Sequence, residues 1–271
     1  MTLRRELAGE VEIFRRPAGD GNSTFVLLHG VGSNAHSFDS LMQALPPSIE
    51  TIAWNAPGYG ESRPLPNPSP SPRDYAAALA VLMDRLGISR TILVGHSLGS
   101  LFAASFAAHF PERVSALALL SPALGYRVAT GELLPAAVQQ RIDELDALGP
   151  VAFAKKRAAR LVGDPLRKPQ VLAAVERAMA AVHPKGYAQA VRALGEGDMR
   201  ADLAAVSVPT LVAVGSKDVI TPPDNARAAR DAFRGKAQYH EIEGCGHALP
   251  QEEPAIVAKI LAAFARENAH V

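Results

Sequence analysis

The sequence predicts an α/β fold built on a mostly parallel sheet, and three observations lead to that prediction. Apolar runs of strand length alternate with segments of helical periodicity over the first part of the chain. One run, 91–94, ends in the turn Gly95-His96-Ser97-Leu98-Gly99 and is followed by a small-residue helical segment, 100–109. The alternation stops over 122–208 and returns near the end of the chain. Such alternation favours parallel strands joined by helical crossovers.

The first strands are expected at 11–14, 25–29 and 51–54. The second of these runs is mainly apolar and leads into a glycine-containing turn, as a strand buried on both faces does. Prolines alternate with other residues over 64–72, and each removes a backbone donor, so we expect a surface connection there. A helix is predicted over about 73–86, where large apolar residues recur at helical spacing.

The later strands are expected at 116–120, 210–214 and 238–242, and an amphipathic helix at 255–266 closes the chain. The stretch 122–208 is rich in Ala, Arg, Leu and Gln, and its helical periodicity is interrupted by glycine and proline.

We therefore predict two parts. The core is made of 1–121 and 209–271, and 122–208 is an inserted helical cap, or lid.

Composition limits the classes of partner. The 28 Lys and Arg balance 27 Asp and Glu, so the net charge of +1 gives no reason to expect nucleic acid or an anionic membrane. A small-molecule substrate fits better. No apolar run approaches the roughly 20 residues that span a bilayer, and residues 1–10 are too charged for a signal peptide. The single cysteine, Cys245, excludes an intrachain disulfide. A cytoplasmic location is the expectation.

Ser97 is the predicted nucleophile. A strand, a sharp turn and a helix around the pattern Gly-x-Ser-x-Gly form a nucleophile elbow, in which the serine is held at the tip of a strained turn. Gly95 and Gly99 remove the collisions that larger side chains would make with the neighbouring helix and strand. The alternative is a chance match in which Ser97 only caps a helix.

A base and an acid decide between these readings. A serine hydroxyl needs a histidine to accept its proton and a carboxylate to orient that histidine. Asp218 follows strand 210–214, and His247 lies in a glycine-flanked loop after strand 238–242. Both are thus expected at the carboxyl edge of the sheet, in the order nucleophile, acid, base. Asp224 is the competing acid.

The oxyanion of a tetrahedral intermediate needs fixed N–H donors. We expect the amides of Leu98, at the start of a helix, and of Val31 to supply them. His29, Gly30 and His96 flank the expected pocket and are predicted to lie near the substrate, positioning backbone or filling space rather than transferring protons.

No cofactor or metal is expected, because the chain has no C-x-x-C, H-E-x-x-H, P-loop or complete G-x-G-x-x-G motif. Cys245 is read as an inert thiol. The cluster Lys155, Lys156, Arg157 and Arg160 is interpreted as a solvated helix face, although Arg127 and Arg160 are also considered as ligands of a substrate carboxylate.

Together, His29-Gly30, the segment 55–62, the elbow, Asp218 and His247 resemble the serine-dependent α/β-hydrolase family. The resemblance covers nearly the whole chain. It implies an eight-stranded, mostly parallel sheet with helices on both faces and a cap after the sixth strand. Residues 187–202 and 208–211 are similar to the cap exit of 3-oxoadipate enol-lactone hydrolases.

The predicted function is cofactor-independent hydrolysis of carboxylic esters or lactones through an acyl-enzyme. The alternatives with the same three residues are carbon–carbon hydrolysis of a β-diketone or ring-fission product, acyl transfer and perhydrolysis. A non-catalytic ligand receptor is the alternative from another class.

Overall fold

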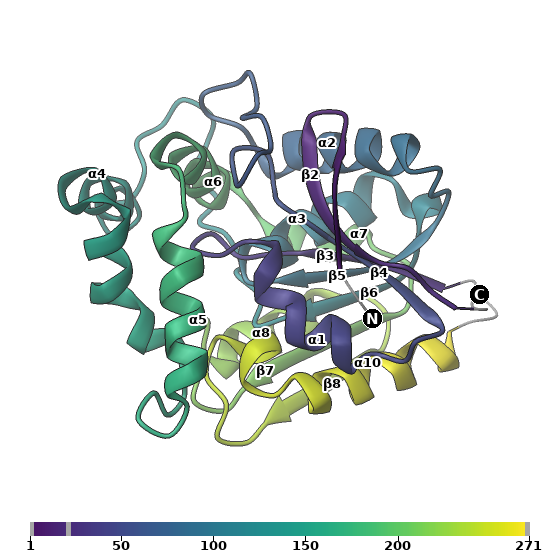
Figure 1. Cartoon of the computed structure of the whole chain (residues 1–271). Helices are drawn as coiled ribbons and strands as arrows, with labels where there is room; N and C mark the ends of the chain where they lie inside the picture. The colour runs from purple at the N-terminus through teal and green to yellow at the C-terminus, as the bar shows by residue number, and fades with distance from the viewer. Residues whose placement is uncertain (1–2, 20–22, 269–271) are drawn as a thin grey trace.

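The computed structural model describes residues 3–19 and 23–268. Its sheet has eight strands in the order β1-β2-β4-β3-β5-β6-β7-β8 (Figure 1). β2 runs antiparallel to β1 and β4, and the other neighbours are parallel. The strands are β1 (Arg4–Ala8), β2 (Val11–Arg16), β3 (Ser23–Leu28), β4 (Ile49–Trp54), β5 (Thr91–His96), β6 (Val114–Leu120), β7 (Thr210–Gly215) and β8 (Ala237–Ile242). The predicted eight-stranded, mostly parallel α/β sheet is confirmed.

Helices cover both faces of the sheet (Figure 1). The α-helices are α1 (Asp39–Ala44), α2 (Pro72–Arg85), α3 (Leu98–His109), α4 (Ala136–Arg157), α5 (Pro169–Ala180), α6 (Pro184–Glu196), α7 (Met199–Ala205), α8 (Pro223–Ala232), α9 (Leu249–Glu252) and α10 (Pro254–Glu267). Short 3-10 helices are η1 (Ala35–Phe38), η2 (Pro111–Arg113) and η3 (Ala158–Leu161).

Two hydrophobic clusters hold the layers together, because successive side chains of a strand point to opposite faces. In β3, Val26 and Leu28 join the cluster that contains residues of α2 and α3. Phe25 and Leu27 join the cluster formed with α1 and α10. Both faces of β3 are therefore buried, as expected of a central parallel strand, and its sequence is accordingly apolar over 25–28.

β1 falls within the charged segment 1–10, where we expected no particular strand. Its side chains are largely exposed, and Arg5 forms an ion pair with Glu12 of β2. Charged side chains are common on edge strands because they discourage pairing with other chains. This is why the strand lacks an apolar pattern.

The chain between β6 and β7 forms α4, η3, α5, α6 and α7. α4, α5 and α6 stand together at the left of Figure 1. Gly186 of α6 lies against Gly58 in the loop after β4, and Gly163 lies against Gly246 in the loop after β8. These helices thus meet the loops at the carboxyl edge of the sheet. α7 instead packs against α3 and α8, so the range predicted as cap, 122–208, includes one helix of the layer beside the sheet.

α4 consists of two arms that meet at a kink. Gly149 has φ 71° and ψ 162°, which interrupts the helical backbone, and Pro150 follows it. Because proline cannot donate to the preceding turn, the second arm starts in a new direction. None of the helices described in the structure is long and apolar enough to cross a lipid bilayer.

Candidate active site

Ser97 occupies the tight turn between β5 and α3. Its φ of 55° and ψ of −117° lie outside the regions that L-residues normally adopt, so the turn is strained. A Cβ atom on Gly95 would lie 2.4 Å from the carbonyl oxygen of Gly99, and one on Gly99 would lie 2.0 Å from that of Leu28. Only glycine fits at either position. The turn therefore has the backbone geometry that the motif predicts for an elbow.

The loop after β3 passes directly over this serine. A Cβ atom on Gly30 would lie 2.9 Å from the Cβ of Ser97, so a side chain at this position would displace the serine. Gly30 is followed by Val31, and both residues line the same cavity as Ser97.

Two backbone amides near Ser97 have no partner. Within residues 3–19 and 23–268, the N–H groups of Val31 and Leu98 donate no hydrogen bond, and both residues line the cavity. Unpaired amides are rare in folded proteins. The amide of Leu98 lies at the start of α3, where the helix dipole favours negative charge. Their positions match those predicted for oxyanion donors.

His29 controls the peptide that carries one of these amides. The N–H of Ala56 donates to Nε2 of His29 over 3.0 Å, so the ring proton is on Nδ1, which donates to the carbonyl of Gly30 over 2.8 Å. That carbonyl belongs to the same peptide unit as the N–H of Val31. Burial lowers the pKa of His29 to about 4, so the ring stays neutral. His29 lies outside the cavity wall. Both of its ring nitrogens are engaged by backbone groups.

His247 and Asp218 form a buried pair. Nδ1 of His247 lies 2.8 Å from Oδ2 of Asp218, while Oδ1 of Asp218 accepts the N–H groups of Ile220 at 2.8 Å and Thr221 at 2.9 Å. Burial by itself would raise the pKa of Asp218, but the charge and hydrogen bond of His247 and the two amides outweigh it and lower the pKa to about 2. The competing acid, Asp224, is exposed and pairs with Arg227.

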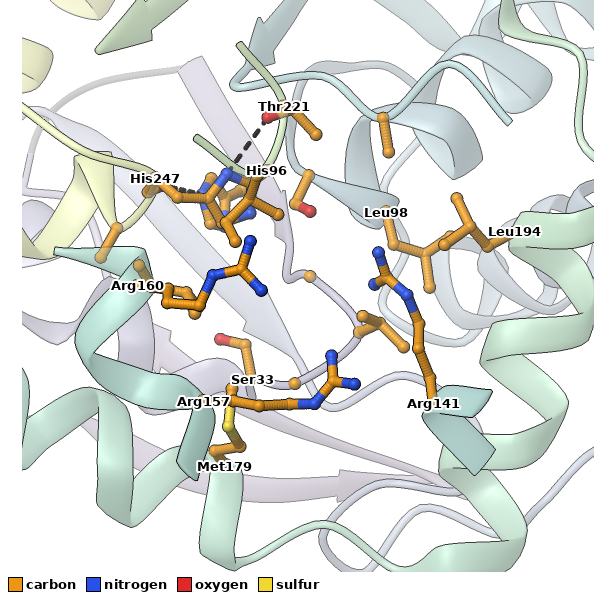
Figure 2. Close-up of a pocket in the computed structure, with 18 of the residues that line it drawn as sticks. Ser33, His96, Leu98, Arg141, Arg157, Arg160, Met179, Leu194, Thr221 and His247 are labelled. Atoms are coloured by element: carbon orange, nitrogen blue, oxygen red, sulfur yellow. Dashed lines mark hydrogen bonds between the residues drawn. The ribbon is translucent and has the colours of Figure 1, made fainter. Parts of the chain in front are cut away.

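Thr221 was not identified from the sequence. Its Oγ1 lies 3.1 Å from Nδ1 of His247, 3.0 Å from Oδ2 of Asp218 and 2.9 Å from the carbonyl oxygen of Ser121 (Figure 2). The single hydroxyl proton can serve only one acceptor at a time. The spacing Asp218-x-x-Thr221, typical of a turn closed by a carboxylate, is the signal that would have indicated it.

His96 joins the elbow to the loop that carries His247. Its Nε2 lies 2.7 Å from the carbonyl oxygen of His247, so Nε2 carries the proton and donates. Burial, together with the nearby ring of His247, lowers the pKa of His96 to about 3. The ring is therefore neutral at ordinary pH. Unlike His29, His96 lies on the cavity wall.

Ser97 and His247 open onto one cavity of about 440 Å³. Within the described ranges, the Ser97 hydroxyl makes no hydrogen bond to His247. Bonds between a nucleophile and its base are often long in the absence of substrate. Apolar side chains form much of the wall: Leu98, Leu124, Phe153, Leu161, Val175, Met179, Leu194, Val219 and Ile220. A volume of this size suits a small organic ligand.

The charged part of the cavity wall is formed by arginines. Arg141, Arg157, Arg160 and Arg200 all line the cavity. Arg157 and Arg160 were interpreted as part of a solvated helix face; Arg160 is exposed and Arg157 half-buried, and both also line the cavity. Arg127, the other arginine considered for a substrate carboxylate, does not lie on the wall.

A buried carboxylate ties the loop of His247 to the inserted helices. Glu252, whose side chain is fully buried, accepts the N–H of Gly246 at 2.9 Å and of Gly163 at 3.0 Å. The N–H of Ala248 donates to the carbonyl of Leu161 over 2.8 Å. The sequence pattern gave no indication of this network.

Comparison with known proteins agrees with this geometry. The family model described as alpha/beta hydrolase fold matches residues 23–254. The chain belongs to the α/β hydrolase fold family.

Three relatives of this hydrolase illustrate the similarity. A pimeloyl-[acyl-carrier protein] methyl ester esterase of Neisseria meningitidis serogroup B is 31% identical, covering 77% of this chain and 80% of the relative. A thermophilic esterase from Thermogutta terrifontis, solved with malate bound, has a TM-score of 0.83 at 25% identity, with 98% of this chain and 99% of the other covered. The enol-lactonase from Burkholderia xenovorans LB400 has a TM-score of 0.85 at 24% identity, covering 97% and 100%. The predicted family and enzyme class are confirmed.

The single thiol of this α/β hydrolase, that of Cys245, is not in a state to act as a nucleophile. Cys245 is fully buried, and burial raises the pKa of its thiol far above the ordinary value, so it stays protonated. Among residues 3–19 and 23–268, no three His, Cys, Asp or Glu side chains are grouped so as to hold a metal ion.

Proposed function

We propose that this α/β hydrolase cleaves carboxylic esters or lactones through an acyl-enzyme formed on Ser97. The observation that carries the proposal is the buried His247–Asp218 pair, which opens onto the same cavity as a serine held in a strained turn. The relative from Neisseria meningitidis bears the name of a methyl ester esterase, which supports an ester as the substrate class.

In the first half of the reaction, His247 accepts the hydroxyl proton of Ser97 through Nε2 as the oxygen attacks the carbonyl carbon. The oxygen of the tetrahedral intermediate becomes negative and is held by the N–H groups of Val31 and Leu98. His247 then gives its proton to the departing alcohol oxygen. With a lactone, that oxygen stays attached to the acyl group.

In the second half, His247 removes a proton from water, which attacks the acyl-enzyme at the same carbon. The intermediate collapses, Ser97 recovers its proton, and the carboxylic acid leaves. Asp218 stays ionised throughout because its pKa is about 2. It keeps the proton of neutral His247 on Nδ1 and stabilises the imidazolium as it forms.

We propose in addition that α4, α5 and α6 form a cap over this centre. Support comes from the cavity wall, to which all three helices contribute, and from the contacts of Gly186 in α6 and of Gly163, just before α5, with loops at the carboxyl edge. A cap of this kind excludes bulk water and selects the acyl group.

Labelling with a fluorophosphonate and turnover of p-nitrophenyl esters test the proposal together. Ser97→Ala is expected to abolish both, whereas Ser33→Ala, which changes another serine on the cavity wall, is expected to retain both. Labelling and turnover that persist in Ser97→Ala would contradict the proposal. If the protein cleaves a β-diketone in a reaction that requires Ser97 but cleaves no ester or lactone, the proposed reaction is replaced by carbon–carbon hydrolysis.

A further inference from the structure

The charge of the cavity wall is of one sign. Four arginines line the cavity, and no Asp or Glu belongs to the described lining. A neutral ester gains nothing from four positive charges on the wall, whereas an anionic group of the substrate is attracted by them. The wall therefore requires an explanation that ester hydrolysis alone does not provide.

Three of the arginines converge from different parts of the inserted helices. Arg141 lies on the first arm of α4, Arg157 at the end of its second arm and Arg160 on η3. Figure 2 shows their guanidinium groups extending into the space that His247, Leu98 and Ser33 surround. The kink at Gly149 makes this convergence possible, because a straight helix of 22 residues would carry Arg141 and Arg157 about 24 Å apart along its axis.

Only one of the three is neutralised by a carboxylate. Glu144, which lies outside the cavity wall, forms ion pairs with Arg157 and Lys156 and so joins the two arms of α4. Arg141 and Arg160 form no ion pair with any described residue. Two positive charges consequently line the cavity without a carboxylate partner, the half-buried Arg141 and the exposed Arg160.

An unpaired hydroxyl lies on the same wall. Tyr187 is 2% exposed and packs edge-on against Phe153, with the ring centroids 5.5 Å apart. Its hydroxyl makes no hydrogen bond within the described residues. Burial raises the pKa of Tyr187, although the charges of Arg141 and Arg157 oppose this, so the hydroxyl remains a donor. A tyrosine hydroxyl without a protein partner on the wall of a cavity is free to donate to an acceptor of a bound ligand.

We infer that the cavity binds an acyl chain with a terminal anionic group, which Arg141, Arg160 and the hydroxyl of Tyr187 hold while the ester carbonyl meets Ser97. This inference rests on the proposed function. Guanidinium groups match the geometry of carboxylate and phosphate alike, so a terminal anion of either chemistry fits. The apolar part of the wall accommodates the chain between the two ends.

Two esters of the same chain length provide the test. Monomethyl adipate carries one methyl ester and one carboxylate, whereas dimethyl adipate has no charge. We expect kcat/KM to be at least about tenfold higher for the charged ester, as one hydrogen-bonded ion pair provides. The preference should decrease as salt is added. The monomethyl esters of succinate and suberate show which chain length fits.

Variants assign the preference to residues. Arg141→Gln and Arg160→Gln are each expected to lower the preference about tenfold, mainly through KM, with little change for dimethyl adipate. Tyr187→Phe should lower it less. The matched control is Lys155→Gln, which removes one positive charge from an exposed position of α4 outside the cavity wall and should leave the preference unchanged.

The outcomes separate this inference from the proposed function. Hydrolysis of both esters that requires Ser97, with no preference and no effect of the arginine variants, would overturn the inference and leave the hydrolase intact. A stronger preference for a methyl ester ending in phosphate, lost in the same variants, would support the anion site and assign phosphate as its ligand.

If no ester or lactone is cleaved, the proposed function fails and binding decides whether the anion site exists. Calorimetry of Ser97→Ala with adipate and with dimethyl adipate then provides the readout. Binding of adipate alone, weakened by Arg141→Gln, would support the anion site. Equal binding of the two compounds, or binding of neither, would refute it.

Discussion

The imidazole of His96 donates a hydrogen bond from Nε2 to the backbone carbonyl of His247 over 2.7 Å. These residues are separated by 151 positions in the chain. The bond connects the side chain of the residue that precedes the proposed nucleophile to the backbone of the proposed base, so it fixes the loop of His247 relative to the elbow. It involves a neutral ring, since the pKa of His96 is lowered to about 3.

Removing this bond should affect stability and rate together. His96→Phe leaves the carbonyl of His247 without a donor, and we expect the free energy of unfolding to fall by about 1–3 kcal/mol. kcat should fall more than KM rises, because the base is less well placed. His96→Gln restores a donor and should recover part of kcat. Urea unfolding and steady-state kinetics measure both effects, and a His96→Phe enzyme with unchanged kcat would contradict the positioning role.

The low pKa of Asp218 predicts how stability depends on pH. Because the pKa falls from 3.8 to about 2 on folding, the unfolded state binds the proton more tightly. The stabilisation is complete above pH 4 and is lost as pH falls from about 4 to about 2. It amounts to about 2 kcal/mol. Asp218→Asn should remove this part of the acid dependence, which unfolding at a series of pH values measures.

Asp218→Asn should also reduce the rate. An amide neither stabilises the imidazolium nor favours the tautomer of His247 with its proton on Nδ1, and kcat is expected to fall about 10³- to 10⁴-fold. Asp224→Asn, at the exposed position that competed with Asp218 in the sequence, is the control and should keep full activity.

His29 should act on the rate through the peptide between Gly30 and Val31. His29→Phe removes the donor to the Gly30 carbonyl and frees this peptide to rotate, so the Val31 amide is less well aimed. We expect kcat to fall about tenfold or more with a smaller change in KM, since the amide acts mainly in the transition state. A rise in KM as large as the fall in kcat would indicate that His29 contacts the substrate instead.

The buried carboxylate of Glu252 provides a test of the link between the inserted helices and the loop of His247. Glu252→Gln replaces one of the two carboxylate oxygens by an NH2 group, so that one backbone N–H faces a donor instead of an acceptor. We expect the free energy of unfolding to fall by about 1–3 kcal/mol and kcat to be lower. Glu253→Gln is the matched control, because Glu253 pairs with Lys168 but accepts no N–H from Gly246 or Gly163. Equal effects of the two substitutions would show that only the charge near Lys168 matters.

Local patterns explain what could be predicted from the sequence. The elbow depends on two glycines beside Ser97, Asp218 follows the apolar strand β7, and His247 lies in a glycine-flanked loop after β8, so short windows contain the information. The same windows gave the parallel strands and most helices. β1 was missed because an exposed edge strand has no apolar face to reveal it.

Contacts between distant segments explain what the sequence did not predict. Glu252 acts on Gly163, which is 89 positions away, and Thr221 bridges to Ser121 across 100 positions. Arg157 and Arg160 have the spacing of an exposed helix face, and that spacing does not show that they share a cavity with Arg141, which lies before the kink at Gly149. The convergence of these arginines was therefore not predicted, although Arg160 was considered as a ligand of a substrate carboxylate.

The measurement that most directly tests the central claim is mass spectrometry of the protein quenched during turnover of p-nitrophenyl acetate. We predict an enzyme heavier by one acetyl group, with the modification on the peptide that contains Ser97. In His247→Gln, the acetyl adduct is expected to persist longer, because no base activates the water that removes it. Turnover without an adduct, or an adduct on a residue other than Ser97, would contradict it.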